Sequence, residues 1–204
     1  MRLLIAIPCM DTVRYEFAES LANLCKHLSE TGIDYEVKWH ATSIIYLARE
    51  ELVNFAVNEN FSHILWLDSD MAFSPDIFAL LRSLETDFAT GCYRTRRPPY
   101  CFVMERVDDP SLRVDKLPKD PFEVAACGFG MVLMTKECAY KIRANFGSVF
   151  TPTPSKGEDY ACCWRWLQMG GKIIAHPDAI ADHITYVRLR CDDPHYLVDY
   201  KEKR

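Results

Sequence analysis

The sequence predicts an α/β protein with a mixed, mostly parallel central sheet that is flanked by helices. Three observations support this class: short apolar runs such as His63–Leu67 suit strands covered on both faces, segments with helical spacing alternate with them, and the connections are short. The length of 204 residues is typical of one such domain. We therefore expect residues 1–204 to form a single domain.

Composition excludes several classes of protein. A net charge of −5 argues against holding a nucleic-acid backbone by charge, so no stable nucleic-acid binding is expected. No apolar run is long enough to be a transmembrane segment, and the run in residues 1–8 is too short for a signal peptide. The nine cysteines are odd in number and form no C-x-x-C pair, which favours a reducing, cytoplasmic location.

The elements follow from periodicity and turn signals. Leu3–Ile7 is predicted as the first strand, and the helix that follows stops at Thr31-Gly32, where glycine supplies a left-handed cap. The later predicted elements are strand Tyr35–Trp39, helix Ile44–Asn58, strand His63–Leu67, helix Pro75–Leu84, strand Asp87–Tyr93, strand Glu123–Met134, helix Lys136–Phe146, a helix from Glu158 to Gly170, strand Lys172–Pro177 and a turn at Asp178–Ala181. Residues 94–121 are expected to form an excursion at the sheet edge, and the tail, residues 192–204, shows no assignable pattern.

Two carboxylates follow the buried strand His63–Leu67 directly, in Asp68-Ser69-Asp70. Side-chain direction repeats every second residue in extended chain, so both acids point to one side and can approach one ion. Ligands of such sheets bind at the carboxyl ends of the strands. The pair therefore favours a divalent metal site. The alternative is a helix cap before Pro75, for which one acid suffices.

Arginines supply candidate anion ligands. Arg49 lies beside the buried face of its helix and is either a ligand or a solvated charge paired with neighbouring glutamates. Arg94, Arg96 and Arg97 open the proline-stiffened excursion and either hold an anionic group or belong to a solvated loop.

Two further stretches carry a structural and a functional interpretation. Gly128 and Gly130 remove side chains where a strand begins, which suits close approach of the backbone to a ligand or a bulge without one. Glu158 and Asp159 open a helix, where acids complement the macrodipole or serve chemistry.

The order and spacing of four elements resemble the GT-A-fold glycosyltransferases of the inverting family-2 type. These elements are the strand ending in Asp68-Ser69-Asp70, the glycine-rich Cys127–Met131, Gly157–Tyr160 opening a helix, and His183. The resemblance extends from Ile5 to about His183. It implies a Rossmann-like GT-A domain that transfers one hexose from a nucleotide-sugar, UDP-glucose being favoured, to an acceptor hydroxyl with inversion.

The resemblance also implies roles for individual residues. Asp70 and His183 would bind Mn²⁺ or Mg²⁺, and Asp68 would assist the metal or hold the ribose. Asp159 matches the catalytic base, with Glu158 as its helper. The other matched positions are those of the nucleotide and donor-sugar pocket, Pro8, Met10, Asp11, Ser43, Arg49, Ser69, Gly128 and Phe129, with Trp164 beside the acceptor.

The acceptor class stays open: a glycan, a lipid-linked sugar or another hydroxyl compound, such as a modified DNA base, would fit. Arg165-Trp166 is present without the glutamine of the Q-x-x-R-W motif of processive synthases. This departure favours transfer of a single sugar over polymer synthesis.

Two rival functions share the Asp-x-Asp pattern. In haloacid-dehalogenase-type phosphatases, Asp68 would be a nucleophile and Asp70 an acid/base, but Met71-Ala72-Phe73 follows where those enzymes want Thr or Val. A catalytically silent nucleotide-binding module would keep both acids without requiring Asp159.

Overall fold

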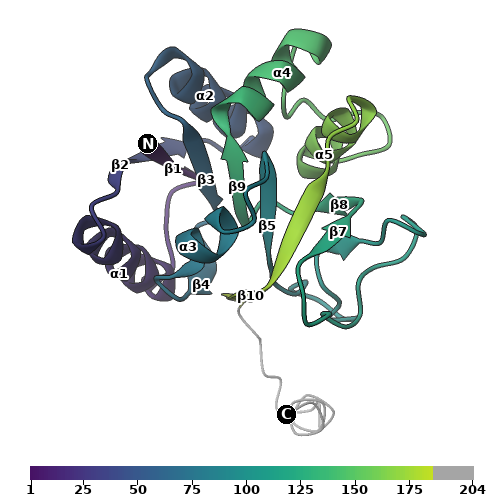
Figure 1. Ribbon diagram of the computed structural model, residues 1–204, viewed down its shortest axis with the longest axis horizontal. Coiled ribbons are helices and arrows are strands. Elements are labelled where there is room, and N and C mark those ends of the chain that lie inside the picture. Colours follow the sequence, from purple (N-terminus) through teal and green to yellow (C-terminus); the bar gives the residue numbers. More distant parts are fainter. Residues whose placement is uncertain (186–204) are drawn as a thin grey trace, which may run out of the picture.

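The computed structural model describes residues 1–185, which are built around an eight-stranded sheet (Figure 1). The strands are β1 (Arg2–Cys9), β2 (Asp34–Ala41), β3 (His63–Leu67), β4 (Met71–Phe73), β5 (Phe88–Cys92), β6 (Met104–Glu105), β7 (Phe122–Val124), β8 (Ala126–Cys127), β9 (Met131–Thr135) and β10 (Ile173–His183). The helices are α1 (Tyr15–Glu30), α2 (Ile45–Asn58), α3 (Ile77–Arg82), α4 (Lys136–Phe146) and α5 (Glu158–Gln168).

The strand order is β2-β1-β3-β9-β5-β10-β4, with β7 paired to β10 beside this path. Strands β1, β2, β3, β5 and β10 run in one direction, whereas β9, β4 and β7 run in the other. The sheet is therefore mixed and mostly parallel, and the predicted fold class is confirmed.

Helices cover both faces of the sheet, and each face has its own apolar core. One core joins α2, α4 and α5 to the sheet around the fully buried Trp66 and Phe150. The other joins α1 and α3 around Phe17 and Leu81. Because a strand between two such layers is buried on both sides, its sequence is a continuous apolar run, as in His63–Leu67.

The predicted end of the last strand is wrong. Residues 178–181 do not turn: β10 continues to His183, and Ala175, Ala179 and Ala181 are buried in alternation with more exposed neighbours. Pro177 has no backbone N–H to donate to a neighbouring strand, so in the sequence it indicates the end of a strand. The pairing with β5 instead shifts register between Ala175 and Ile180, which accommodates the proline within one strand.

The predicted strand Glu123–Met134 is in fact three short strands, β7, β8 and β9. Each pairs with a different partner: β7 with β10, β8 with β6, and β9 with both β3 and β5. Strand β4 was not predicted, because three residues after an acidic turn carry too short a pattern to detect.

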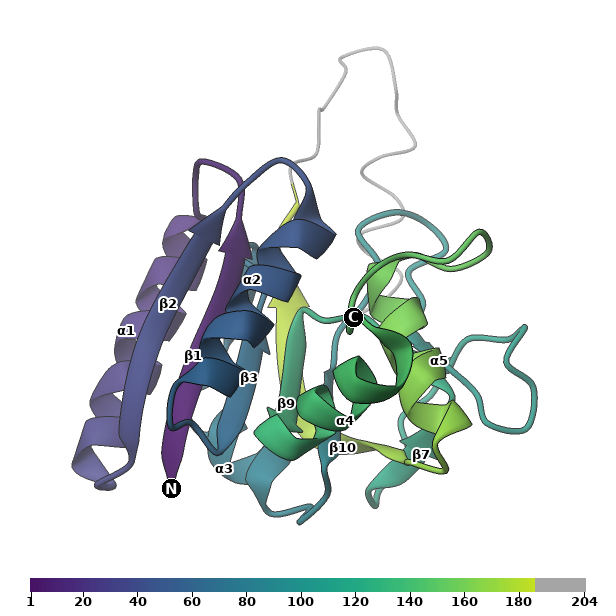
Figure 2. The same ribbon diagram turned by 90° about the horizontal axis from the view of Figure 1, so that it is seen from above.

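The excursion of residues 94–121 lies at one edge of the molecule, next to α5 and β7 (Figure 2). It begins as a hairpin in which Arg94 pairs with Phe102 and the Val103 N–H donates to the Tyr93 carbonyl at 3.0 Å. The predicted tail, residues 192–204, lies outside the described residues. None of the helices within residues 1–185 is long and apolar enough to cross a membrane.

Candidate functional site

Asp68, Ser69 and Asp70 form the turn between β3 and β4, at the carboxyl end of β3. The Asp68 N–H donates to the Gly130 carbonyl at 3.2 Å, and the Arg14 N–H donates to the Ser69 carbonyl at 3.2 Å. The turn is thus fixed from two sides. The helix-capping interpretation is wrong for both acids, because the residue that precedes α3 is Asp76.

Arg49 of α2 approaches this turn from inside the protein. Its side chain is 3% exposed, and its Nη2 donates to Asp68 Oδ1 at 2.9 Å. The guanidinium lies 5.3 Å from the ring centre of Phe129 and 5.7 Å from that of Phe150. Its Nε and Nη1 are buried without a hydrogen-bond partner. Arg49 is therefore not a solvated helix charge; it is a buried cation that neutralises Asp68.

Asp70 meets His183 because β4 pairs with the end of β10. His183 is in register with Met71, and the Ile184 N–H donates to the Asp70 carbonyl at 2.8 Å. His183 Nε2 then lies 3.5 Å from Asp70 Oδ2. Burial disfavours the charged form of Asp70, but the hydrogen bond and charge of His183, together with Arg96, outweigh it, so the pKa of Asp70 lies below its usual value.

The other ring nitrogen of His183 faces a backbone acceptor. Its Nδ1 lies 2.9 Å from the Arg94 carbonyl. A carbonyl can only accept, so Nδ1 carries a proton and donates it to Arg94, and Nε2 is the ring nitrogen that faces Asp70. This arrangement, in which the second nitrogen fixes the tautomer, is typical of metal-binding histidines.

The predicted ligand set fits a metal only in part. No three His, Cys, Asp or Glu side chains converge anywhere in residues 1–185, and Asp68 faces Arg49. Two donors do converge, Asp70 Oδ2 and His183 Nε2. A hard cation that binds a nucleotide commonly takes one or two protein ligands and completes its shell with phosphates and waters. The pair fits such a cation.

The two glycines accommodate a tyrosine. A Cβ on Gly128 would lie 2.3 Å from the Tyr93 hydroxyl, and one on Gly130 would lie 2.8 Å from Cζ of the same ring. The Gly130 N–H donates to that hydroxyl at 2.9 Å, and the Tyr93 ring packs edge-on against His183 at 5.4 Å between ring centres. Tyr93 was missed in the sequence because a single aromatic at a strand end carries no pattern. Its ring supports His183.

Phe129 is 1% exposed and packs against the rings of Trp66 and Phe150 as well as Arg49. In this position it supports Arg49 from within the core. It offers almost no surface to a bound sugar.

Glu158 and Asp159 form the first turn of α5. Burial, and then the charge of Glu158, raise the pKa of Asp159 from 3.8 to about 7, although Arg49 opposes this shift. The segment before α5 is held in place because Arg165 donates to the carbonyls of Val149 and Thr151 at 2.9 and 2.6 Å. A carboxyl group that ionises near neutral pH is suited to accept a proton.

The remaining predicted residues lie at the carboxyl ends of β1 and β2. Pro8 is in register with His40 inside the sheet, whereas Met10, Asp11 and Ser43 are exposed in the loops that follow. Cys9 pairs with Ala41, so these two loops begin side by side next to β3. The predicted pocket residues thus share one edge of the sheet with Asp68 and Asp70.

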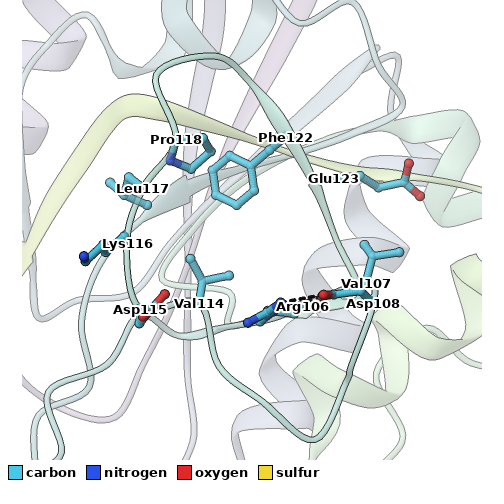
Figure 3. Close-up of a pocket in the computed structure, with 10 residues that line it drawn as sticks. All are labelled: Arg106, Val107, Asp108, Val114, Asp115, Lys116, Leu117, Pro118, Phe122 and Glu123. Atoms are coloured by element: carbon cyan, nitrogen blue, oxygen red, sulfur yellow. Dashed lines mark hydrogen bonds and ion pairs between the residues drawn. The ribbon is translucent and has the colours of Figure 1, made fainter.

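A cavity of about 550 Å³ lies elsewhere, on the excursion (Figure 3). Val114, Leu117 and Phe122 form its apolar part, and Arg106 donates to Asp108 at 2.9 Å along one side. None of the predicted site residues lines it.

No protein-family model matches the chain, and no curated protein matches its sequence. Solved structures do match. Protein A197 from STIV aligns over 95% of this chain and 100% of its own, with a TM-score of 0.58 and 18% identity. GalNAc-T7, crystallised with UDP, GalNAc and Mn²⁺, aligns over 92% of this chain and 44% of its own, with a TM-score of 0.55 and 13% identity.

The inositol-1-phosphate CTP transferase from T. maritima aligns over 100% of this chain and 97% of its own, with a TM-score of 0.50 and 11% identity. The chain has a Rossmann-like GT-A fold. At these identities the likeness establishes the fold, which this chain shares with a glycosyltransferase and a nucleotidyltransferase.

Proposed function

We propose that the protein is a metal-dependent glycosyltransferase that moves one hexose from a UDP-sugar to an acceptor hydroxyl, with inversion at the anomeric carbon. The observation that carries the proposal is that the pKa values of Asp70 and Asp159 are shifted in opposite directions. Asp70, whose pKa lies below its usual value, has its Oδ2 3.5 Å from His183 Nε2, whereas the pKa of Asp159 is raised to about 7. GalNAc-T7, which shares the fold, contains UDP, GalNAc and Mn²⁺ in its structure, which supports this choice.

On the donor side, Asp70 and His183 are the residues that would hold Mn²⁺ or Mg²⁺. When bound, the cation would neutralise the nucleoside diphosphate as it leaves. One imidazole in an oxygen-rich site favours Mn²⁺. The Arg94 carbonyl keeps His183 in the tautomer that presents Nε2, so the hairpin contributes to the donor site.

On the acceptor side, Asp159 would remove the proton of the attacking hydroxyl. The acceptor oxygen forms its bond to the anomeric carbon while the bond from that carbon to the diphosphate oxygen breaks on the opposite face. A base with a pKa near the working pH combines a useful deprotonated fraction with a useful affinity for the proton. Glu158 contributes by raising the pKa of Asp159.

The nucleotide would lie over the loops that carry Met10, Asp11 and Ser43, with Pro8 beneath. Arg49 would act from below the pocket by holding Asp68, since its side chain is buried. UDP-glucose is the favoured donor. The acceptor would be a glycan, a lipid-linked sugar or another hydroxyl compound.

The test is to incubate the protein with a panel of nucleotide-sugars, with and without Mn²⁺, and to follow release of nucleoside diphosphate. We expect release with at least one donor, dependent on the cation and abolished in Asp159→Asn. Absence of turnover with every donor, together with absence of cation-dependent nucleotide binding, would refute the proposal.

The same assay separates the competing functions. Release of pyrophosphate from a nucleoside triphosphate and a sugar phosphate would indicate nucleotidyl transfer, as in the CTP transferase that shares the fold. Cation-dependent binding without turnover would indicate the silent nucleotide-binding module. Release of inorganic phosphate from phosphate esters would indicate the phosphatase.

A further inference from the structure

Arg96 occupies the place at Asp70 that a cation would take. Its Nη1 donates to Asp70 Oδ2 at 2.8 Å, and the same oxygen faces His183 Nε2 at 3.5 Å. A metal bound between Asp70 and His183 would therefore compete with the guanidinium for one carboxylate oxygen. Nothing in the sequence had distinguished Arg96 from Arg94 and Arg97.

The backbone beside Arg96 is held while its side chain is accessible. The Thr95 N–H donates to the Cys101 carbonyl at 3.0 Å, and the Thr95 hydroxyl donates to the Arg97 carbonyl at 2.9 Å. The Arg94 carbonyl is bound by His183. The Arg96 side chain, however, is 55% exposed. The guanidinium can consequently leave Asp70 by side-chain rotation, without movement of the hairpin.

The two arginines of the site differ in this respect. Arg49 is 3% exposed and enclosed by aromatic rings, so it is a permanent partner of Asp68. Arg96 is a partner that Asp70 can exchange. If a divalent cation takes Asp70, the arginine becomes a surplus positive charge a few ångströms from the oxygens that the cation attracts. Guanidinium matches phosphate oxygens in charge and in geometry.

We propose that Arg96 is a donor-binding residue with two partners: it binds Asp70 when the site lacks a metal, and it turns to a phosphate oxygen of the nucleoside diphosphate when the metal binds Asp70. This inference rests on the proposed function, because it requires a cation and a diphosphate at Asp70. The proposal adds a residue of the excursion to the donor site. It also means that the cation replaces the Arg96 guanidinium at the Asp70 carboxylate when it binds.

The test compares Arg96→Ala with Arg97→Ala. Arg97 is the matched control, since it is also an exposed arginine of the same hairpin and its removal changes the net charge equally. Mn²⁺ affinity is measured without nucleotide from the electron paramagnetic resonance signal of free Mn²⁺. UDP affinity is then measured by calorimetry at saturating Mn²⁺.

Removal of the competing guanidinium should tighten Mn²⁺ binding by about fivefold in Arg96→Ala, the range of an exposed ion pair. The same variant should bind UDP about tenfold more weakly in the presence of Mn²⁺, because a charged hydrogen bond to phosphate is lost. Arg97→Ala should match the wild type in both measurements.

Equal Mn²⁺ affinity in the two variants, or weaker binding in Arg96→Ala, would overturn the exchange; so would unchanged UDP binding. If the wild type binds Mn²⁺ and UDP together while the two variants behave alike, only this inference fails. If the wild type binds Mn²⁺ neither alone nor with UDP, the proposed function fails as well.

Discussion

Replacement of Asp159 by asparagine should change the pH dependence of stability. The pKa of Asp159 rises from 3.8 to about 7 on folding, so the protonated carboxyl favours the folded state. That contribution is complete below about pH 4 and is lost as the pH rises towards 7. Each pH unit in this window is worth at most about 1.4 kcal/mol. The variant retains an oxygen that can accept the Tyr160 N–H, which lies 2.7 Å from Asp159 Oδ1, and never ionises.

The free energy of unfolding of Asp159→Asn, relative to the wild type, should therefore increase by at most about 3 kcal/mol between pH 5 and pH 8. Urea unfolding followed by circular dichroism at pH 5, 6, 7 and 8 measures this difference. Asp120→Asn, on an exposed carboxylate of the excursion, is the control and should show no such trend. A difference that stays constant or shrinks as the pH rises would refute the assignment of a buried, high-pKa Asp159.

Three further variants test other parts of the site. Asp70→Asn should weaken cation-dependent nucleotide binding, whereas Asp159→Asn should keep binding and lose turnover by about 10²- to 10⁴-fold; calorimetry and kinetics that show identical defects would contradict this division. Arg49→Met leaves the acid it pairs with unneutralised and should lower the free energy of unfolding by about 3 kcal/mol in urea; an unchanged value would contradict the buried ion pair. Gly128→Ala forces a Cβ to within 2.3 Å of the Tyr93 hydroxyl and should cost about 1 to 3 kcal/mol, part of which Tyr93→Phe should restore; a neutral Gly128→Ala would contradict the contact.

The helices and strands of the regular part of the fold were predictable because buried faces give a regular spacing of apolar residues in the sequence. The helix Lys136–Phe146 was predicted with the bounds that the structure shows, and the core strand that begins at His63 and precedes the two acids was predicted in its place. Errors came where local signals conflict with pairing. Pro177 resembles a break, and only the partner strand β5 reveals that β10 continues to His183.

The site was predictable at positions where charged side chains lie so close together that they need a neutralising partner. Asp68 and Asp70 were found because two adjacent like charges require neutralisation. The sequence did not show which arginine pairs with which acid. The buried Arg49 forms an ion pair with Asp68, and Arg96, which lies 26 positions after Asp70 in the chain, forms one with Asp70. Such pairs depend on how a hairpin folds back over the sheet edge, and no periodicity records that.

In the proposed function, a divalent cation and a nucleoside diphosphate bind together at Asp70. The most direct measurement is the affinity of the wild type for UDP by calorimetry, with and without Mn²⁺. The binding of one ligand typically changes the affinity for a second by about 5- to 150-fold where the two are coupled, and we expect UDP to bind at least about tenfold more tightly with the cation. We also expect Asp70→Asn to abolish this difference. Equal UDP affinity of the wild type in the presence and absence of Mn²⁺ would contradict the account.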